Sequence, residues 1–143
     1  MMLVTMVLAG AIALGCQCAR WYLEREGRKE SEHWGGRVKL TALRNSGAAF
    51  GLLPLSGKWL AAASAVVLTI SAALYRGCRM GCALILGGGL SNLWERVRHG
   101  SVFDYIAFPK APGKVRRYVF NLADFAIFVG TVIVLLSERK KKR

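Results

Sequence analysis

Residues 118–137 read YVFNLADFAIFVGTVIVLLS, twenty residues in which Asp124 is the single charge. A helix needs roughly 20 predominantly apolar residues to cross a bilayer. This run therefore predicts a membrane-spanning helix that carries a carboxyl group. A carboxylate within a span costs roughly 2.5–3.5 kcal/mol, so it indicates a functional role by default.

Three further runs of the chain contain no charge. The first covers residues 1–19 and lacks the basic start of a cleaved signal peptide, so we expect it to be a retained span. The run at 80–94 is short, but arginines at both of its ends can snorkel and lengthen the span. The sequence predicts an all-α membrane protein, one peptidase domain over residues 1–143, with four transmembrane helices at about 2–19, 59–75, 80–94 and 118–137.

Charge is segregated from these runs. The chain of 143 residues is 54% hydrophobic, yet its formal net charge is +13. Membrane burial excludes nucleic acid as the partner of so basic a chain, and anionic lipid headgroups are the expected partner. The basic tail at 139–143 favours cytoplasmic termini by the positive-inside rule. The loops at 20–58 and 95–117 are also basic, so charge alone leaves the orientation open.

Residues 37–44 alternate polar and apolar side chains, which is the period of a half-buried strand. Asn45, Ser46 and Gly47 follow with turn chemistry. We therefore expect a small β element in the loop after the first span.

Residues 87–89 are three consecutive glycines within the third predicted span. Small residues let helices approach closely in lipid, so helix packing is the first interpretation. A second, compatible interpretation is that they leave room for a substrate helix.

The four cysteines do not predict a metal site. Cys16 and Cys18 fall at the end of the first predicted span, whereas Cys78 and Cys82 lie at the opposite membrane face. The two pairs cannot share one zinc ion, and small packing residues are the expected role. No cofactor is expected.

Aspartate occurs only twice among the eight acidic residues, at Asp104 and Asp124, both in apolar surroundings. Two converging carboxyl groups share a proton, so that one can activate water while the other polarises a carbonyl. The alternative is that Asp124 pairs with Arg96 or Arg44 and holds helices together. Spacing leaves both interpretations open.

Three blocks of the sequence resemble the lipoprotein signal peptidases, or signal peptidase II. Residues 44–50 (RNSGAAF) are similar to the family's Asn-x-Gly-Ala-Ala-Phe block. Residues 87–105 (GGGLSNLWERVRHGSVFDY) resemble its Gly-Gly, Asn-x-x-Asp-Arg and Gly-x-Val-x-Asp-Phe block. Residues 120–124 (FNLAD) are close to its Phe-Asn-x-Ala-Asp block.

The resemblance implies an aspartic endopeptidase of the bacterial cytoplasmic membrane, with cytoplasmic termini and an active site at the outer face. It implies cleavage of diacylglyceryl-modified prolipoproteins just before the lipidated cysteine, by a monomer whose partners are these lipidated signal peptides and membrane lipids. The catalytic residues would be Asp104 and Asp124. The polar residues that line the substrate site would be Asn45, Asn92, Arg96 and Asn121.

Four positions depart from the family pattern. Cys16 stands where the family has an acid in the first span, and Glu95 stands where Asp is usual. Tyr105 replaces Phe, and Ser91 replaces Gly. These departures leave two alternative functions, a catalytically weak paralogue that binds lipidated peptides and a structural membrane subunit.

Overall fold

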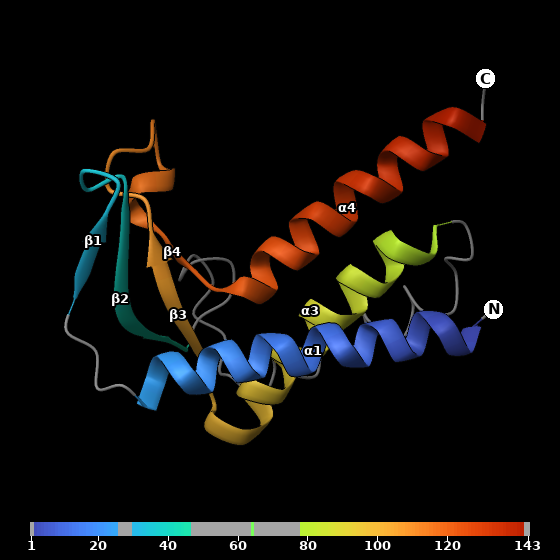
Figure 1. Ribbon diagram of the computed structural model, residues 1–143, viewed down its shortest axis with the longest axis horizontal. Coiled ribbons are helices and arrows are strands. Elements are labelled where there is room, and N and C mark those ends of the chain that lie inside the picture. Colours follow the sequence, from blue (N-terminus) through green and yellow to red (C-terminus); the bar gives the residue numbers. More distant parts are fainter. Residues whose placement is uncertain (1, 26–29, 47–63, 65–77, 142–143) are drawn as a thin grey trace.

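In the described part of the chain three long helices pack together, and a small sheet runs across one end of them (Figure 1). The computed structural model describes residues 2–25, 30–46, 64 and 78–141. The first residues of α1 and the last residues of α4 both lie on the side away from the sheet. In chain order the elements are α1 (Met2–Arg25), β1 (Ser31–His33), β2 (Val38–Asn45), α3 (Arg79–His99), β3 (Val102–Ala107), a 3-10 helix η1 (Val115–Arg117), β4 (Val119–Phe120) and α4 (Leu122–Lys141).

Helix α3 is the central helix and packs against both α1 and α4. Its glycines allow this close approach. A Cβ atom at Gly87 would lie 2.7 Å from the carbonyl oxygen of Ala9, and one at Gly88 would lie 2.6 Å from that of Ala123. The packing interpretation of these glycines is therefore confirmed. The second interpretation, room for a substrate helix, stays a prediction; at these two positions the atoms nearest the glycines belong to α1 and α4.

The sheet is antiparallel throughout, with the strand order β1-β2-β3-β4. The predicted strand at 37–44 is confirmed as β2, displaced by one residue. The β element is larger than predicted, however, because β3 and β4 join it from later in the chain. In the register of β2 with β3, Leu43 lies opposite Asp104. One of the two aspartates thus sits on a strand.

The helix bounds differ from the predicted spans. Helix α1 continues to Arg25, and α3 extends through the charged residues that follow position 94. The expected start of the last span at 118 was wrong, because residues 119–120 pair with β3 and α4 begins only at Leu122. The predicted span at 59–75 lies outside the described residues, apart from Ser64. Among the described helices, α1 alone is both long and apolar enough to cross a membrane.

The cysteines are free thiols. Cys16 and Cys82 are buried in α1 and α3, while Cys18 is exposed on α1. Burial of two small side chains within the helix bundle supports the packing role expected for them.

Candidate active site

Asp104 lies in the middle of β3 and is 3% exposed. Its carboxylate accepts hydrogen bonds from two side-chain amides, Nδ2 of Asn45 at 3.1 Å and Nδ2 of Asn121 at 2.8 Å. Burial raises the pKa of Asp104 to about 6, and the nearby charge of Asp124 adds to this rise. The two amides and Arg96 oppose it only in part. Asp104 therefore holds a proton up to a higher pH than an exposed aspartate does.

Asp124 lies in the first turn of α4, three residues after Asn121. The backbone N–H of Asp124 donates to Oδ1 of Asn121 at 3.0 Å, and the backbone N–H of Asn121 donates to Oδ2 of Asp124 at 3.0 Å. These reciprocal bonds form a capping box, which fixes the start of a helix. Nδ2 of Asn92 donates to the other carboxylate oxygen at 3.0 Å. The positive end of the helix dipole also favours a carboxylate here.

Asn121 connects the two aspartates. Its side-chain amide group donates to Asp104, while its side-chain carbonyl and backbone N–H complete the capping box with Asp124. The sequence places these aspartates twenty positions apart, and one buried asparagine brings them to a common site. Of the predicted site residues, the structure gathers Asp104, Asp124, Asn45, Asn92 and Asn121 through hydrogen bonds.

Arg96 is adjacent to this cluster. Its guanidinium donates to the backbone oxygen of Asn92 at 3.3 Å, and its charge favours the ionised form of Asp104. Arg44 lies elsewhere, in ion pairs with Glu24 and Glu95. The carboxylate of Asp124 is held by amide donors, so the interpretation of a helix-joining ion pair with Arg44 was wrong.

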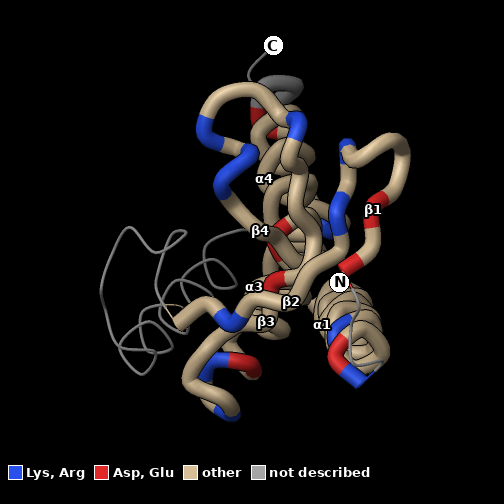
Figure 2. Tube along the Cα trace, turned by 90° about the vertical axis from the view of Figure 1, so that its left-hand side faces the viewer, with Lys and Arg blue, Asp and Glu red and all other residues tan. Residues whose placement is uncertain are grey.

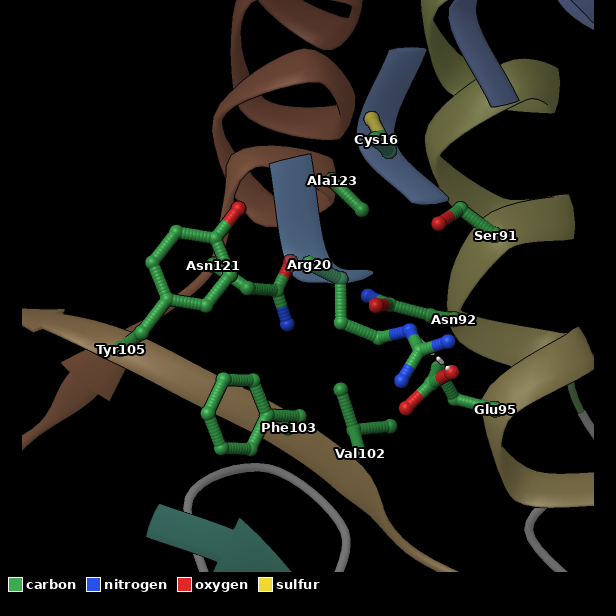
Figure 3. Close-up of a pocket in the computed structure, with 10 residues that line it drawn as sticks. All are labelled: Cys16, Arg20, Ser91, Asn92, Glu95, Val102, Phe103, Tyr105, Asn121 and Ala123. Atoms are coloured by element: carbon green, nitrogen blue, oxygen red, sulfur yellow. Dashed lines mark ion pairs between the residues drawn. The ribbon is translucent and has the colours of Figure 1, made fainter. Parts of the chain in front are cut away.

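A charged cluster that the sequence did not predict lies beside these amides. Glu95, 2% exposed, pairs with Nε of Arg20 at 2.8 Å and with Nη1 of Arg44 at 3.6 Å. Arg20 and Arg44 both contact Glu24 as well. Burying a carboxylate is costly unless it is paired, so the cluster joins α1, α3 and β2. Figure 3 shows the Arg20–Glu95 pair in a pocket that also contains Cys16, Asn92 and Asn121.

Tyr105 and Ser91 make polar contacts near the site that the sequence did not predict. The hydroxyl of Tyr105 accepts a hydrogen bond from the backbone N–H of Leu122 at 3.0 Å, at the start of α4. Nε2 of Gln17 donates to the backbone oxygen and the hydroxyl of Ser91, at 3.1 and 3.0 Å. Both Tyr105 and Ser91 are departures from the family pattern, and each gains a polar contact that the usual residue lacks. The change of residue type at these two positions was the sequence feature from which their contacts could have been predicted.

Two carboxyl groups that share one asparagine beside apolar helices are in keeping with one class of protein, the membrane aspartic peptidases. The chain belongs to the signal peptidase II family, whose model, described as "Signal peptidase (SPase) II", matches residues 8–139. The function expected from the resemblance, removal of signal peptides from prolipoproteins by an aspartic endopeptidase, is confirmed by this membership.

Individual relatives agree with the family. The lipoprotein signal peptidase of Clostridioides difficile is 39% identical over 114 residues, which is 72% of this chain and 74% of that protein. The one of Syntrophomonas wolfei is 37% identical over 134 residues, covering 85% and 83% of the two chains. The fold matches a bacterial membrane enzyme solved by the in meso method at 2.3 Å resolution, with a TM-score of 0.83 at 19% identity, over 97% of this chain and 89% of that one.

Proposed function

We propose that Asp104 and Asp124 are the catalytic dyad of this peptidase. The observation that carries the proposal is the position of Asn121, which donates to one carboxylate and closes the capping box with the other. The negative charges of two carboxyl groups at one site disfavour each other, so one of the two ionises less readily. The rise that Asp124 causes in the pKa of Asp104 is in keeping with this closeness.

The surroundings assign the two carboxyl groups different tasks. Asp124 accepts a backbone N–H at the positive end of α4, which favours its ionised form and suits it to take a proton from water. Asp104 is buried on a strand, and its pKa of about 6 makes it hold a proton more readily than an exposed aspartate does. In its protonated form it hydrogen-bonds to the scissile carbonyl oxygen. The activated water attacks the carbonyl carbon as one of its protons passes to Asp124. The C–N bond then breaks, and Asp124 gives that proton to the leaving amine.

The substrate is a prolipoprotein whose cysteine carries a diacylglyceryl group, and the bond cleaved is the one just before that cysteine. Asn45, Asn92 and Asn121 line the site, and in the free enzyme their amides hold the two carboxylates. Arg96 has a guanidinium that is hydrogen-bonded only to a backbone oxygen among the described residues. It is therefore free to bind a carbonyl or headgroup oxygen of the substrate.

The site lies where the helices meet the sheet, which suits a peptidase that works at the membrane surface (Figure 1). We propose that the chain crosses the membrane four times as a monomer, with both termini in the cytoplasm and the dyad at the outer face. The helix ends support this arrangement, because α1 begins and α4 ends on the side away from the sheet. The basic residues after α4 are suited to the cytoplasmic face.

The test is expression of the chain in cells depleted of their own lipoprotein signal peptidase, beside the variants Asp104→Asn and Asp124→Asn. The chain is expected to restore processing of lipoprotein precursors. Each variant should insert normally and process at least about 10³-fold more slowly, because a catalytic unit fails when one member is removed.

The outcome separates the alternatives. Precursor that accumulates while co-purifying with the unaltered chain would favour a catalytically weak binding paralogue. Absence of both processing and binding would favour a structural subunit. Full processing by either aspartate variant would exclude the dyad.

A further inference from the structure

The turn between β1 and β2 ends in an exposed aromatic side chain. Trp34 is 78% exposed and has a φ angle of 51°, in the left-handed region that residues with a Cβ atom rarely adopt. Gly35 and Gly36 follow with φ angles of 64° and 78°. A glycine or asparagine would fit position 34 at lower cost. A bulky indole kept there, in water and in a strained conformation, points to a role outside the fold.

A basic segment lies beside this turn. The residues between β3 and α4 contain four cations and no acidic residue. One of them, Lys110, ties the segment to the turn through a hydrogen bond from Nζ to the backbone oxygen of Gly35 at 2.7 Å. The cations are exposed, and none is ion-paired within the described part of the chain. They are Lys110, Lys114, Arg116 and Arg117.

The turn and the basic segment lie at the same end of the sheet and are joined by the Lys110–Gly35 hydrogen bond. Their exposed aromatic and cationic residues are here called the basic tip: Trp34, Arg37, Lys110, Lys114, Arg116 and Arg117. In Figure 2 the lysines and arginines of both segments lie toward the upper end of the tube, those of the turn on the right and those of the basic segment on the left. Its acidic neighbour is Glu32, on the adjacent strand. The tip therefore combines several positive charges with a single large amphipathic ring.

The position of the basic tip relative to the helices indicates what it meets. The strands run across the helix ends, and the loop that follows β3 extends to one side beyond the start of α4 (Figure 1). Only five positions separate Arg117 from Leu122, where the apolar helix begins. If the helices cross the bilayer as proposed, the sheet lies along the membrane surface and the tip overhangs lipid.

We propose that the basic tip is an interfacial anchor that binds anionic phospholipid headgroups of the leaflet beside the active site, with Trp34 inserted at headgroup depth. Indole rings partition to this depth because they are amphipathic. Each cation near an anionic surface favours binding roughly fivefold. The anchor would fix the sheet, and with it Asp104 on β3, relative to the membrane. This inference rests on the proposed membrane topology and not on the identity of the catalytic residues.

The test uses the full chain in lipid nanodiscs, with Trp34 as the single fluorophore after Trp21, Trp59 and Trp94 are changed to Phe. Quenching of Trp34 by brominated phosphatidylglycerol is compared with quenching by brominated phosphatidylcholine at the same mole fraction. The anchor predicts at least about twofold stronger quenching by the anionic lipid, because the cations concentrate it locally.

Two triple variants separate charge from structure. Lys114→Gln/Arg116→Gln/Arg117→Gln should lose the preference for the anionic lipid, whereas the charge-preserving Lys114→Arg/Arg116→Lys/Arg117→Lys should keep it. Equal quenching by both lipids in the parent, or a preference that survives removal of the three charges, would overturn the proposal. So would a Trp34 that no lipid quenches but that an added acidic peptide protects from aqueous acrylamide, because the partner would then be a protein.

The variant Trp34→Gly tests whether the left-handed conformation of Trp34 costs the fold stability. Trp34→Gly should unfold in detergent at the same temperature as the parent or higher, because glycine tolerates the left-handed conformation. In nanodiscs rich in phosphatidylglycerol it should lose much of the stabilisation that this lipid gives the parent. A lower unfolding temperature in detergent would mean that Trp34 serves the fold, which contradicts the anchor. None of these measurements depends on peptidase activity, so the anchor and the dyad can fail separately.

Discussion

The two ends of the candidate site hold their aspartates by different means. Asp124 is part of a helix start, where a backbone N–H, a side-chain amide and the helix dipole support a negative charge. Asp104 is on a strand whose backbone groups are used in the sheet, and its carboxylate has only side-chain donors, from Asn45 and Asn121.

This difference is the physical basis for the different tasks that we propose for the two aspartates. A carboxyl group that is buried and weakly supported keeps its proton, whereas one at a helix N-terminus gives it up more readily. The asymmetry is built by local backbone structure and needs no third ionisable group. If it is correct, changes near each aspartate should have separable consequences.

The largest of these effects is expected from substitution of Asn121, because this residue contacts both Asp104 and Asp124. Asn121→Ala removes a donor from Asp104 and the capping box of α4 together. Misplacing catalytic groups by about 1 Å can cost about 10²-fold in rate, so we expect a fall in kcat of that order. Cleavage of a synthetic lipopeptide in detergent would measure it.

Asn121→Asp is the matched variant. It keeps an N-cap oxygen but places a third carboxylate against Asp104, so it should be at least as inactive as Asn121→Ala while starting α4 normally. An Asn121→Ala enzyme with unchanged kcat would mean that the two aspartates are held together by something else.

A smaller effect should appear in the pH profile of Asn45→Ala. Of the two aspartates, Asn45 donates a hydrogen bond only to Asp104. This bond favours the ionised form of Asp104, so its loss should raise the pKa of Asp104 above about 6. In the proposed mechanism Asp104 acts in its protonated form, so kcat/KM should fall as pH rises through that pKa. The basic limb of the profile should therefore move to higher pH, by about one unit.

Asn92→Ala is the control for this shift, because Asn92 contacts Asp124 and leaves both donors of Asp104 in place. It should lower the rate without moving the basic limb upward. A limb that moves equally in both variants, or moves to lower pH in Asn45→Ala, would contradict the assignment of the proton to Asp104.

The sequence alone carried much of this arrangement. Period-two alternation predicted β2 to within one residue, and the cost of a carboxylate in an apolar run singled out Asp124. The start of α4 was misplaced because residues 118–137 look uniformly apolar. The true boundary comes from the pairing of β4 with β3 and from the Asn121–Asp124 capping box. The first of these is a contact between segments distant in sequence, which composition does not record.

The charged cluster escaped prediction for the same reason. Arg20, Arg44 and Glu95 are far apart in the chain, and each looked like a residue at the end of a span or strand. Only the packing of α1 against α3, and of β2 beside them, turns them into ion pairs. The departure at Glu95 was visible in the sequence, but its partner was not.

The smallest expected effects are those of substitutions at the two ends of the contact between α3 and α4. A Cβ atom at Gly88 would lie 2.6 Å from the carbonyl oxygen of Ala123, next to Asp124, and one at Gly130 would lie 2.7 Å from that of Gly81, far along α4. Overpacking costs about 1–3 kcal/mol, so Gly88→Ala and Gly130→Ala should lower the thermal midpoint in detergent by similar amounts.

Their catalytic consequences should differ, because only Gly88→Ala displaces the first turn of α4 and with it the bond between Asn92 and Asp124. We expect a fall in kcat of about tenfold for Gly88→Ala and little change for Gly130→Ala when both are assayed below their midpoints. Equal losses of kcat would mean that activity follows the stability of the helix pair as a whole. A loss confined to Gly88→Ala would show that the helix start itself sets the position of Asp124.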